Sequence, residues 1–98
     1  MTTYLMLGSF TDQGIRDIAE TTNRAEAFQA MAAASGIEVK EMYWTAGPYD
    51  VMCLMDSPDE ETVNALALKA GALGNVRTTL MRAFTRSEMQ RIVAKIPN

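Results

Sequence analysis

The stretch Val51-Met52-Cys53-Leu54-Met55 is an unbroken apolar run, entered from Tyr43-Trp44-Thr45-Ala46-Gly47-Pro48-Tyr49-Asp50. A strand with one face in water alternates apolar and polar residues, and this run does not. Both faces of the strand are therefore expected to be covered. Helices of the same chain can cover one face, and a chain of 98 residues is expected to need a partner for the other.

Hydrophobic periodicity and turn residues on either side of this run predict four strands and three helices. The strands are expected at residues 4–10, 37–46, 49–56 and 76–84. The helices are expected at residues 12–35 with a kink or restart near Thr21–Asn23, from Ser57 to the glycines at 71 and 74, and after Thr85. Gly47-Pro48 predicts a turn, which makes the second and third strands an antiparallel pair.

The resulting order, β-α-β-β-α-β plus a terminal helix, predicts an α+β protein of the ferredoxin-like type. Such a chain forms a four-stranded antiparallel sheet with two helices on one face, here in a single domain spanning residues 1–98. Apolar or aromatic residues occur on both faces of the first three strands. We therefore expect a homo-oligomer, at least a dimer, in which a second subunit covers the open face of the sheet.

Local patterns add finer predictions. Capping boxes, in which the side chains of the N-cap and of the third helical residue bond each other's backbone, are expected at Asn23–Glu26, Ser57–Glu60 and Thr85–Glu88. Strict alternation along the second strand predicts that one face carries Ile37, Val39, Glu41 and Tyr43.

Composition excludes several classes of function. Nine basic and twelve acidic residues give a net charge of -3, which provides no basic face for nucleic acid or for an anionic membrane. No apolar run is long enough to span a bilayer, and the N-terminal residues do not form a secretory signal. Cys53 is the only cysteine, so no intrachain disulfide can form. We expect a cytoplasmic protein.

Histidine is absent from the chain. This excludes a Ser-His-Asp triad, a Cys-His pair, a histidine-ligated haem and the facial triad of non-haem iron. The methionines do not cluster with other soft ligands, and Cys53 lies within an apolar strand where an inert buried thiol is expected. We therefore expect neither a metal site nor a cofactor.

Gly47-Pro48-Tyr49-Asp50, preceded by Tyr43-Trp44-Thr45, resembles the Gly-Xaa-Tyr-Asp signature of the GYD domain family. Residues 4–14, 71–78 and 82–85 resemble further stretches of that family. The family is similar to the dimeric α/β-barrel group, in which two ferredoxin-like sheets close into a barrel. That group includes cofactor-free monooxygenases, muconolactone-type isomerases, haem enzymes and small-ligand sensors, so the resemblance implies a fold and a dimer without selecting a function.

Two constellations are candidates for a site. Trp44, Tyr49 and Asp50 can place an indole, a phenol and a carboxylate beside a cleft, where Tyr49 or Asp50 can act as acid or base. Alternatively they close a turn, fill the edge of the core and satisfy backbone donors.

Asn75 and Arg77 follow a glycine-rich segment and can hold a carboxylate or phosphate. Alternatively they belong to a turn in which Arg77 pairs with an acid such as Asp50.

Three functions remain open at this stage. The first is a small-molecule-binding module whose pocket lies between the sheet and the helices, with Trp44, Tyr49, Asp50, Asn75 and Arg77 as ligand-binding residues. The second is a cofactor-free monooxygenase or isomerase that uses Tyr49 or Asp50 as proton acceptor and Asn75 or Arg77 to stabilise an oxyanion. The third is a structural subunit of a larger assembly.

Overall fold

A computed structural model describes all residues from Met1 to Asn98. Its elements alternate as predicted, and the first predicted helix is divided into three segments. In chain order they are β1 (Thr2–Phe10), α1 (Asp12–Arg16), a 3₁₀ turn η1 (Ile18–Glu20), α2 (Thr21–Ala34), β2 (Glu38–Trp44), β3 (Val51–Ser57), α3 (Glu60–Ala72), β4 (Val76–Arg82) and α4 (Arg86–Ala94).

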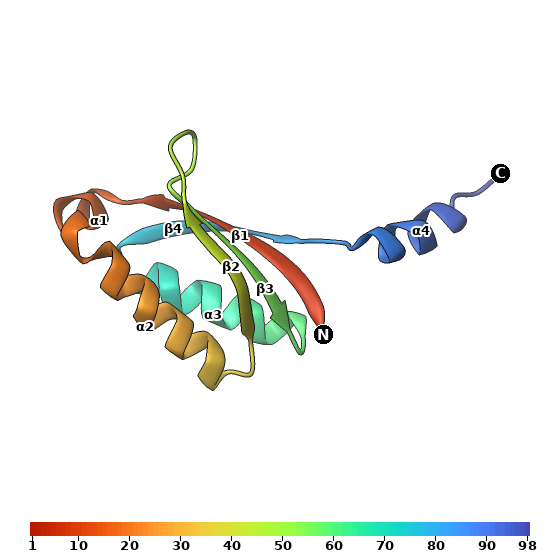
Figure 1. Ribbon diagram of the computed structural model, residues 1–98, viewed down its shortest axis with the longest axis horizontal. Helices are drawn as coiled ribbons and strands as arrows, with labels where there is room; N and C mark the ends of the chain where they lie inside the picture. Colours follow the sequence, from red (N-terminus) through yellow and green to blue (C-terminus); the bar gives the residue numbers. More distant parts are fainter.

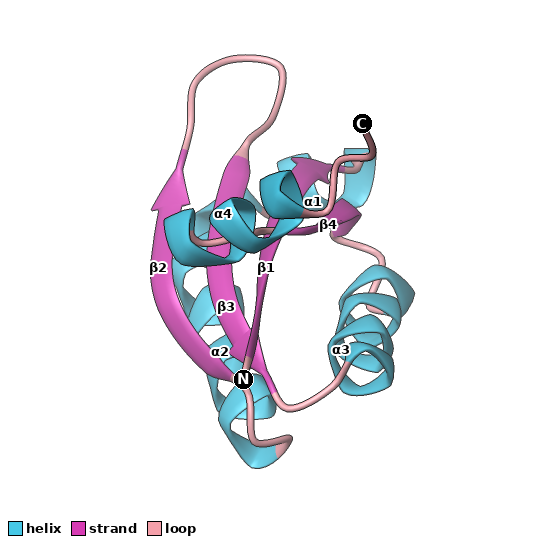
Figure 2. Cartoon of the chain, turned by 90° about the vertical axis from the view of Figure 1, so that its right-hand side faces the viewer, coloured by secondary structure: helices cyan, strands magenta, loops and turns pink.

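The four strands form one sheet in the order β2-β3-β1-β4, and all neighbours are antiparallel. Helices α2 and α3 lie side by side on one face of the sheet, and no element of the chain covers the other face (Figures 1 and 2). This is the ferredoxin-like α+β arrangement, so the predicted fold is confirmed. None of the helices has the length and hydropathy needed to cross a bilayer.

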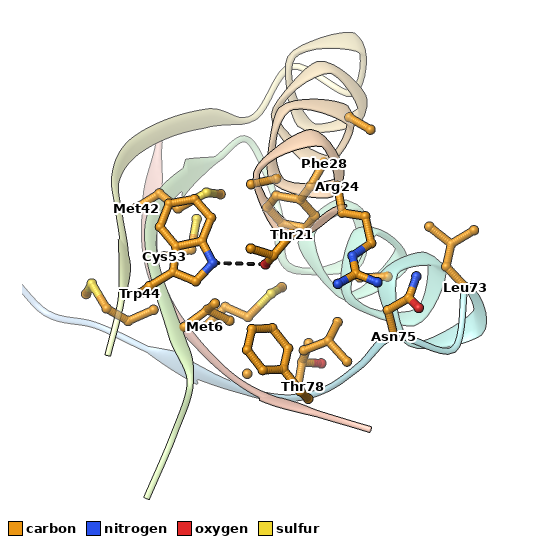
Figure 3. A pocket seen from close by; sticks show the side chains of 18 of the residues that line it. Met6, Thr21, Arg24, Phe28, Met42, Trp44, Cys53, Leu73, Asn75 and Thr78 are labelled. Carbon is orange, nitrogen blue, oxygen red and sulfur yellow. Dashed lines mark hydrogen bonds between the residues drawn. The ribbon is translucent and has the colours of Figure 1, made fainter. Parts of the chain in front are cut away.

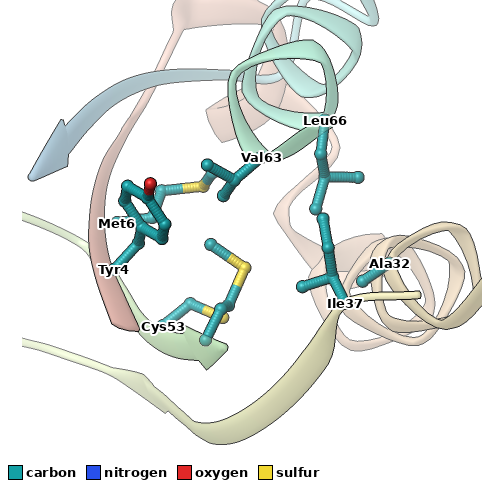
Figure 4. Packing of buried hydrophobic residues seen from close by; sticks show 8 residues of the cluster. Tyr4, Met6, Ala32, Ile37, Cys53, Val63 and Leu66 are labelled. Carbon is teal, nitrogen blue, oxygen red and sulfur yellow. The ribbon is translucent and has the colours of Figure 1, made fainter. Parts of the chain in front are cut away.

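The core lies between the sheet and the two helices (Figure 4). Met55 of β3 and Val63 of α3 are fully buried at its centre, with Tyr4 and Met6 of β1 beside them. Burying side chains of this size contributes about 1.5–3 kcal/mol each. The apolar run in β3 thus anchors both helices to the sheet.

The open face of the sheet carries a second set of apolar side chains. Leu5 lies opposite Leu54 on one side and Met81 on the other, and Leu7 lies opposite Met52. Met81 is 40% exposed, and the remaining four are partly buried by their neighbours. These five residues, here called the open-face cluster, are covered by nothing else in the chain.

Strand β2 contains a bulge that reverses the predicted alternation. The register shifts between Val39 and Glu41, so that Val39 lies opposite buried Met55 while Glu41 lies opposite Leu54 on the open face. The prediction that Val39 and Glu41 share a face was therefore wrong. A bulge inserts one extra residue, here Lys40, and shifts every later side chain by one position. The shift places Met42 and Trp44 on the side of the sheet that faces the helices.

One of the three predicted capping boxes is present in the structure. Thr85 and Glu88 form the predicted capping box at the start of α4. The box predicted at Ser57 was wrong, because Ser57 is the fully buried end of β3 and Asp59 caps α3 by accepting a hydrogen bond from the Thr62 N–H at 2.7 Å. The box predicted at Asn23 was also wrong, because α2 begins at Thr21 without a side-chain cap.

Two segments extend beyond the compact body. Residues 45–50 form a loop between β2 and β3 that is longer than the predicted turn and projects away from the helix layer (Figure 2). Helix α4 stands apart from the other helices beyond the end of the sheet (Figure 1), and the molecule is therefore 53 Å long. Glu88 of α4 forms an ion pair of 2.7 Å with Arg82 of β4, which fixes the first turn of this helix.

Candidate functional site

A pocket of about 170 Å³ lies between the sheet and helices α2 and α3 (Figure 3). Fourteen of its nineteen lining residues are hydrophobic. Met6 and Cys53 line it from the sheet, and Phe28 lines it from α2. Gly8 also lies in this wall, where a Cβ atom would stand 2.6 Å from a methyl group of Val51.

Helix α2 supplies one wall through its periodicity. Thr21, Arg24, Phe28 and Met31 all line the pocket. Their spacing of three, four and three residues places them on one helical face. The polar residues of this face come first and the apolar ones follow, so the wall changes from polar to apolar along the helix. The beginning of α2 therefore forms the polar end of the pocket.

Trp44 closes the pocket at the edge of the sheet. Its indole Nε1–H donates a hydrogen bond of 3.0 Å to Thr21 Oγ1, which connects the end of β2 to the start of α2. The indole is 45% exposed, so it lies at the boundary between the pocket and solvent. This position depends on the bulge at Lys40, which directs Trp44 toward the helices.

Two polar groups lie together on the side of the pocket away from Trp44. The guanidinium of Arg24 donates from Nη2 to the carbonyl oxygen of Gly14 at 3.1 Å. The amide of Asn75 is oriented by Gln13, whose Nε2 donates to Asn75 Oδ1 at 2.9 Å. Figure 3 shows the guanidinium and the amide pointing toward one another beside Leu73. Both groups therefore present N–H donors on the same side of the pocket.

A family comparison identifies the chain. A model of the GYD domain matches residues 4–93, which is nearly the whole sequence. This protein belongs to the GYD domain family. The resemblance of residues 47–50 to the family signature, noted from the sequence, is thereby confirmed.

Individual proteins resemble this GYD domain at lower identity. A protein of Thermus thermophilus, named glutamine synthetase and cystathionine beta-lyase binding protein, is 27% identical over 90 residues, covering 91% of this chain and 95% of that one. The crystal structure of TTHA0845 from the same organism has a TM-score of 0.56 at 26% identity, covering 87% and 95% of the two chains. The crystal structure of FFRP-DM1 has a TM-score of 0.61 at 22% identity, covering 86% and 100%, and shows likeness of fold alone.

The tyrosine and the aspartate of the GYD signature lie outside the pocket lining. Asp50 is half-buried, and its Oδ2 accepts a hydrogen bond of 2.8 Å from the Phe10 backbone N–H. Tyr49 is exposed in the loop, and its carbonyl oxygen accepts a bond from the Thr45 hydroxyl at 2.6 Å. Neither side chain is an anchor of this pocket, and a role for either one elsewhere stays a prediction.

Arg77 is also absent from the pocket lining. It lies opposite Ser9 on the open face of the sheet, is exposed, and forms no ion pair with Asp50. Among the residues predicted from the sequence, only Trp44 and Asn75 line the cavity. Trp44 reaches the cavity from the end of β2, whereas Asn75 reaches it from the turn before β4.

Arg24 is the residue that sequence reasoning missed. Its place within the predicted capping box at Asn23–Glu26 gave no reason to assign it to a site. Arg24 stands four residues before Phe28, and this helical spacing was the signal that both side chains share a face. A positive charge at the polar end of an apolar stripe is the pattern that would have identified it.

The titratable groups of the lining are Arg24 and Cys53. Cys53 is 5% exposed, and burial raises the pKa of its thiol to about 12. A thiol with such a pKa stays protonated at neutral pH and is a poor nucleophile. The pocket can therefore hold and orient a small molecule through N–H and O–H donors, whereas a general base must come from outside its lining.

Proposed function

We propose that this GYD domain is an oligomeric module that binds a small molecule in the pocket between the sheet and helices α2 and α3. The observation that carries the proposal is the distribution of groups in the lining. The lining is mostly apolar, Arg24 and Asn75 lie together on one side of it, and Trp44 lies on the other side. Ligand sites combine an apolar surface with a few converging polar groups in this way.

The size of the pocket limits the ligand. An engineered apolar cavity of roughly 150 Å³ accepts benzene. The pocket described here has about 170 Å³, which suits one ring or a short branched chain. A polar substituent of such a ligand would extend toward Arg24 and Asn75.

The ligand experiment uses the only tryptophan of the chain as a reporter. Trp44 lines the pocket, so occupation by a neutral probe such as benzyl alcohol should change its fluorescence. The variant Ala25→Leu fills the lining and should weaken binding at least tenfold. The matched control Ala30→Leu changes an exposed residue of the same helix and should leave binding unaltered. Equal binding by both variants would refute the proposed pocket.

We also propose that the open-face cluster is the contact between two copies of the chain. Four of its five apolar residues lie on the two central strands, β1 and β3, and Met81 lies on the edge strand β4. A two-fold axis parallel to the strands would set β2 of one copy against β4 of the second, so that the two clusters would cover each other.

Sedimentation analysis tests this contact. The variant Leu54→Lys places a charge in the centre of the open-face cluster and should yield a folded monomer. Leu68→Lys introduces the same residue at a position of α3 that is 75% exposed, and should leave a dimer intact. A wild-type monomer at micromolar concentration, or a dimer that persists in Leu54→Lys, would overturn this part of the proposal.

A second candidate function is that of an accessory subunit that binds an enzyme. The name of the Thermus relative favours it, and helix α4 provides a suitable surface. Met89, Ile92 and Val93 are exposed on this projecting helix. The test is the affinity of purified glutamine synthetase and cystathionine beta-lyase for wild type, Ile92→Asp and the neighbouring control Gln90→Asp. Loss of binding in Ile92→Asp alone would support this function, and no binding by wild type would exclude it for these two enzymes.

A further inference from the structure

The arginine in the pocket has no acidic partner. The chain contains two ion pairs, Lys40–Asp56 and Arg82–Glu88, and neither involves Arg24. The lining of the pocket includes no aspartate or glutamate. A guanidinium carries five N–H donors, and Arg24 uses one nitrogen to bond the Gly14 carbonyl. A half-buried positive charge with unused donors in an apolar surrounding is a site for an anion.

The amide of Asn75 adds a donor beside this guanidinium. Because Gln13 donates to Asn75 Oδ1, the Nδ2 group lies on the side of the Arg24 guanidinium with both of its hydrogens available. Gln13 is held in turn by the carbonyl of Leu73 at 3.2 Å. The backbone around Asn75 approaches Gly14 so closely that a Cβ atom there would lie 2.1 Å from the Asn75 oxygen. The donor is therefore held in place by the surrounding backbone.

The hydroxyl group of Thr21 adds a further donor. Thr21 is the first residue of α2 and lines the pocket. Thr21 Oγ1 accepts from Trp44, so the hydroxyl hydrogen can be donated onward. Glu20, the residue before Thr21, lies outside the lining and accepts a hydrogen bond from Asn23 at 2.7 Å.

From this one-sided set of donors we infer that the ligand is a carboxylate with a small apolar body, either an aromatic ring or a short branched chain. The carboxylate binds Arg24 and Asn75, and the apolar body lies between Phe28 and Met6. One guanidinium and one amide match the two oxygens and the single charge of a carboxylate. A phosphate dianion would keep an uncompensated charge beside an apolar wall. The inference rests on the proposed binding function and specifies the class of ligand.

The test compares two probes of equal shape, benzoate and the neutral benzamide, by Trp44 fluorescence and calorimetry. Wild type should bind benzoate about tenfold or more tightly than benzamide, since a charge-assisted bond exceeds a neutral one. The preference should vanish in Arg24→Gln. Arg16→Gln, which changes an exposed arginine outside the pocket, should retain it. Melting curves verify that each variant is folded.

A second variant tests the inference independently, in case Arg24→Gln does not fold. Asn75→Asp keeps the oxygen that accepts from Gln13 and replaces the donor Nδ2 by an oxygen. It should bind benzoate at least tenfold more weakly and bind benzamide as wild type does. Equal affinity of wild type for the two probes would overturn the carboxylate inference and leave the pocket proposal intact. Binding of neither probe, nor of benzyl alcohol, at millimolar concentration would overturn both.

Discussion

The Asp50 carboxylate accepts a hydrogen bond of 2.8 Å from the Phe10 backbone N–H, 40 positions earlier in the chain. The Asp50 N–H itself donates to the Gly8 carbonyl at 2.8 Å. The aspartate of the GYD signature thus joins the start of β3 to the end of β1. This placement indicates a structural role in holding the two central strands beside the pocket.

Replacing Asp50 should therefore destabilise the fold. Asp50→Ala leaves the Phe10 N–H without its charged acceptor, and should lower the free energy of unfolding by about 1.5–3 kcal/mol. Asp50→Asn keeps an acceptor oxygen and should have a smaller effect. Urea denaturation measures both. Tyr49→Phe is the neighbouring control, and its effect should stay within about 0.5 kcal/mol because the side chain is exposed. A stable Asp50→Ala variant that has lost ligand binding would contradict the structural role.

The close approach of Gly14 to Asn75 gives a second prediction. A Cβ atom at Gly14 would lie 2.1 Å from the Asn75 carbonyl oxygen, so Gly14→Ala must displace the backbone that carries Asn75. We expect a loss of about 1–3 kcal/mol in stability, together with weaker benzoate binding. Thermal melts and the fluorescence titration measure the two effects.

Gly71→Ala is the matched control for this substitution. Gly71 lies within α3, and nothing stands within 4 Å of the added Cβ atom. Alanine is the better helix former by about 1 kcal/mol, so this variant should be slightly more stable than wild type. Similar stabilities for Gly14→Ala and Gly71→Ala would show that the turn before β4, which carries Asn75, moves without a cost in stability.

The buried thiol gives a prediction that depends on pH. Burial raises the pKa of Cys53 to about 12 from an ordinary value near 9.0. Alkylation of the folded protein by iodoacetamide should accelerate roughly tenfold per pH unit between pH 7 and 10, without the plateau near pH 9 that a free thiol shows. Between pH 9 and 12 the Cys53 thiol keeps its proton in the folded state and releases it in the unfolded state. The contribution of this thiol to the free energy of unfolding is therefore lost as pH rises from 9 toward 12.

Ligand protection tests the position of the same thiol. Cys53 lines the pocket, so saturating benzoate should slow its alkylation. Alkylation in urea supplies the rate of the exposed thiol. A folded-state rate that levels off near pH 9, or a rate that does not respond to benzoate, would contradict the placement of Cys53 in the pocket wall.

The order of elements could be predicted because each one has a local signal. The apolar run of β3, the helical stripe of α3 and the capping box at Thr85 each depend on neighbouring residues. The bulge at Lys40 has no such signal, since it depends on how β2 matches the register of β3. Ser57 and Asp59 were equally good caps by residue type, and burial of Ser57 at the end of β3 decided between them.

The candidate site was harder to predict because it is assembled from distant segments. Trp44 and Asn75 were chosen from their local context, and both line the pocket. Asp50 was chosen on the same grounds, but its partner is the Phe10 N–H, a backbone group that residue patterns do not identify. The spacing between Arg24 and Phe28 could have placed Arg24 on the helix face that lines the pocket. The lack of a carboxylate beside it could not be predicted, because the other lining residues come from distant parts of the chain.

The last prediction concerns the attachment of α4. Hydrogen bonds from the Thr85 backbone N–H and from Arg82 lower the pKa of the Glu88 carboxyl to about 2. A carboxyl with a lowered pKa stabilises the folded arrangement above its ordinary value near 4.5, and this contribution is lost as pH falls toward 2. NMR should therefore show the Glu88 carboxyl titrating near pH 2, with the amide signals of α4 shifting over the same range. In Glu88→Gln these amide shifts should disappear, and trypsin should cleave after Arg86 and Arg91 faster than in wild type. A Glu88 midpoint near pH 4.5 would mean that α4 is not held by Arg82 in solution.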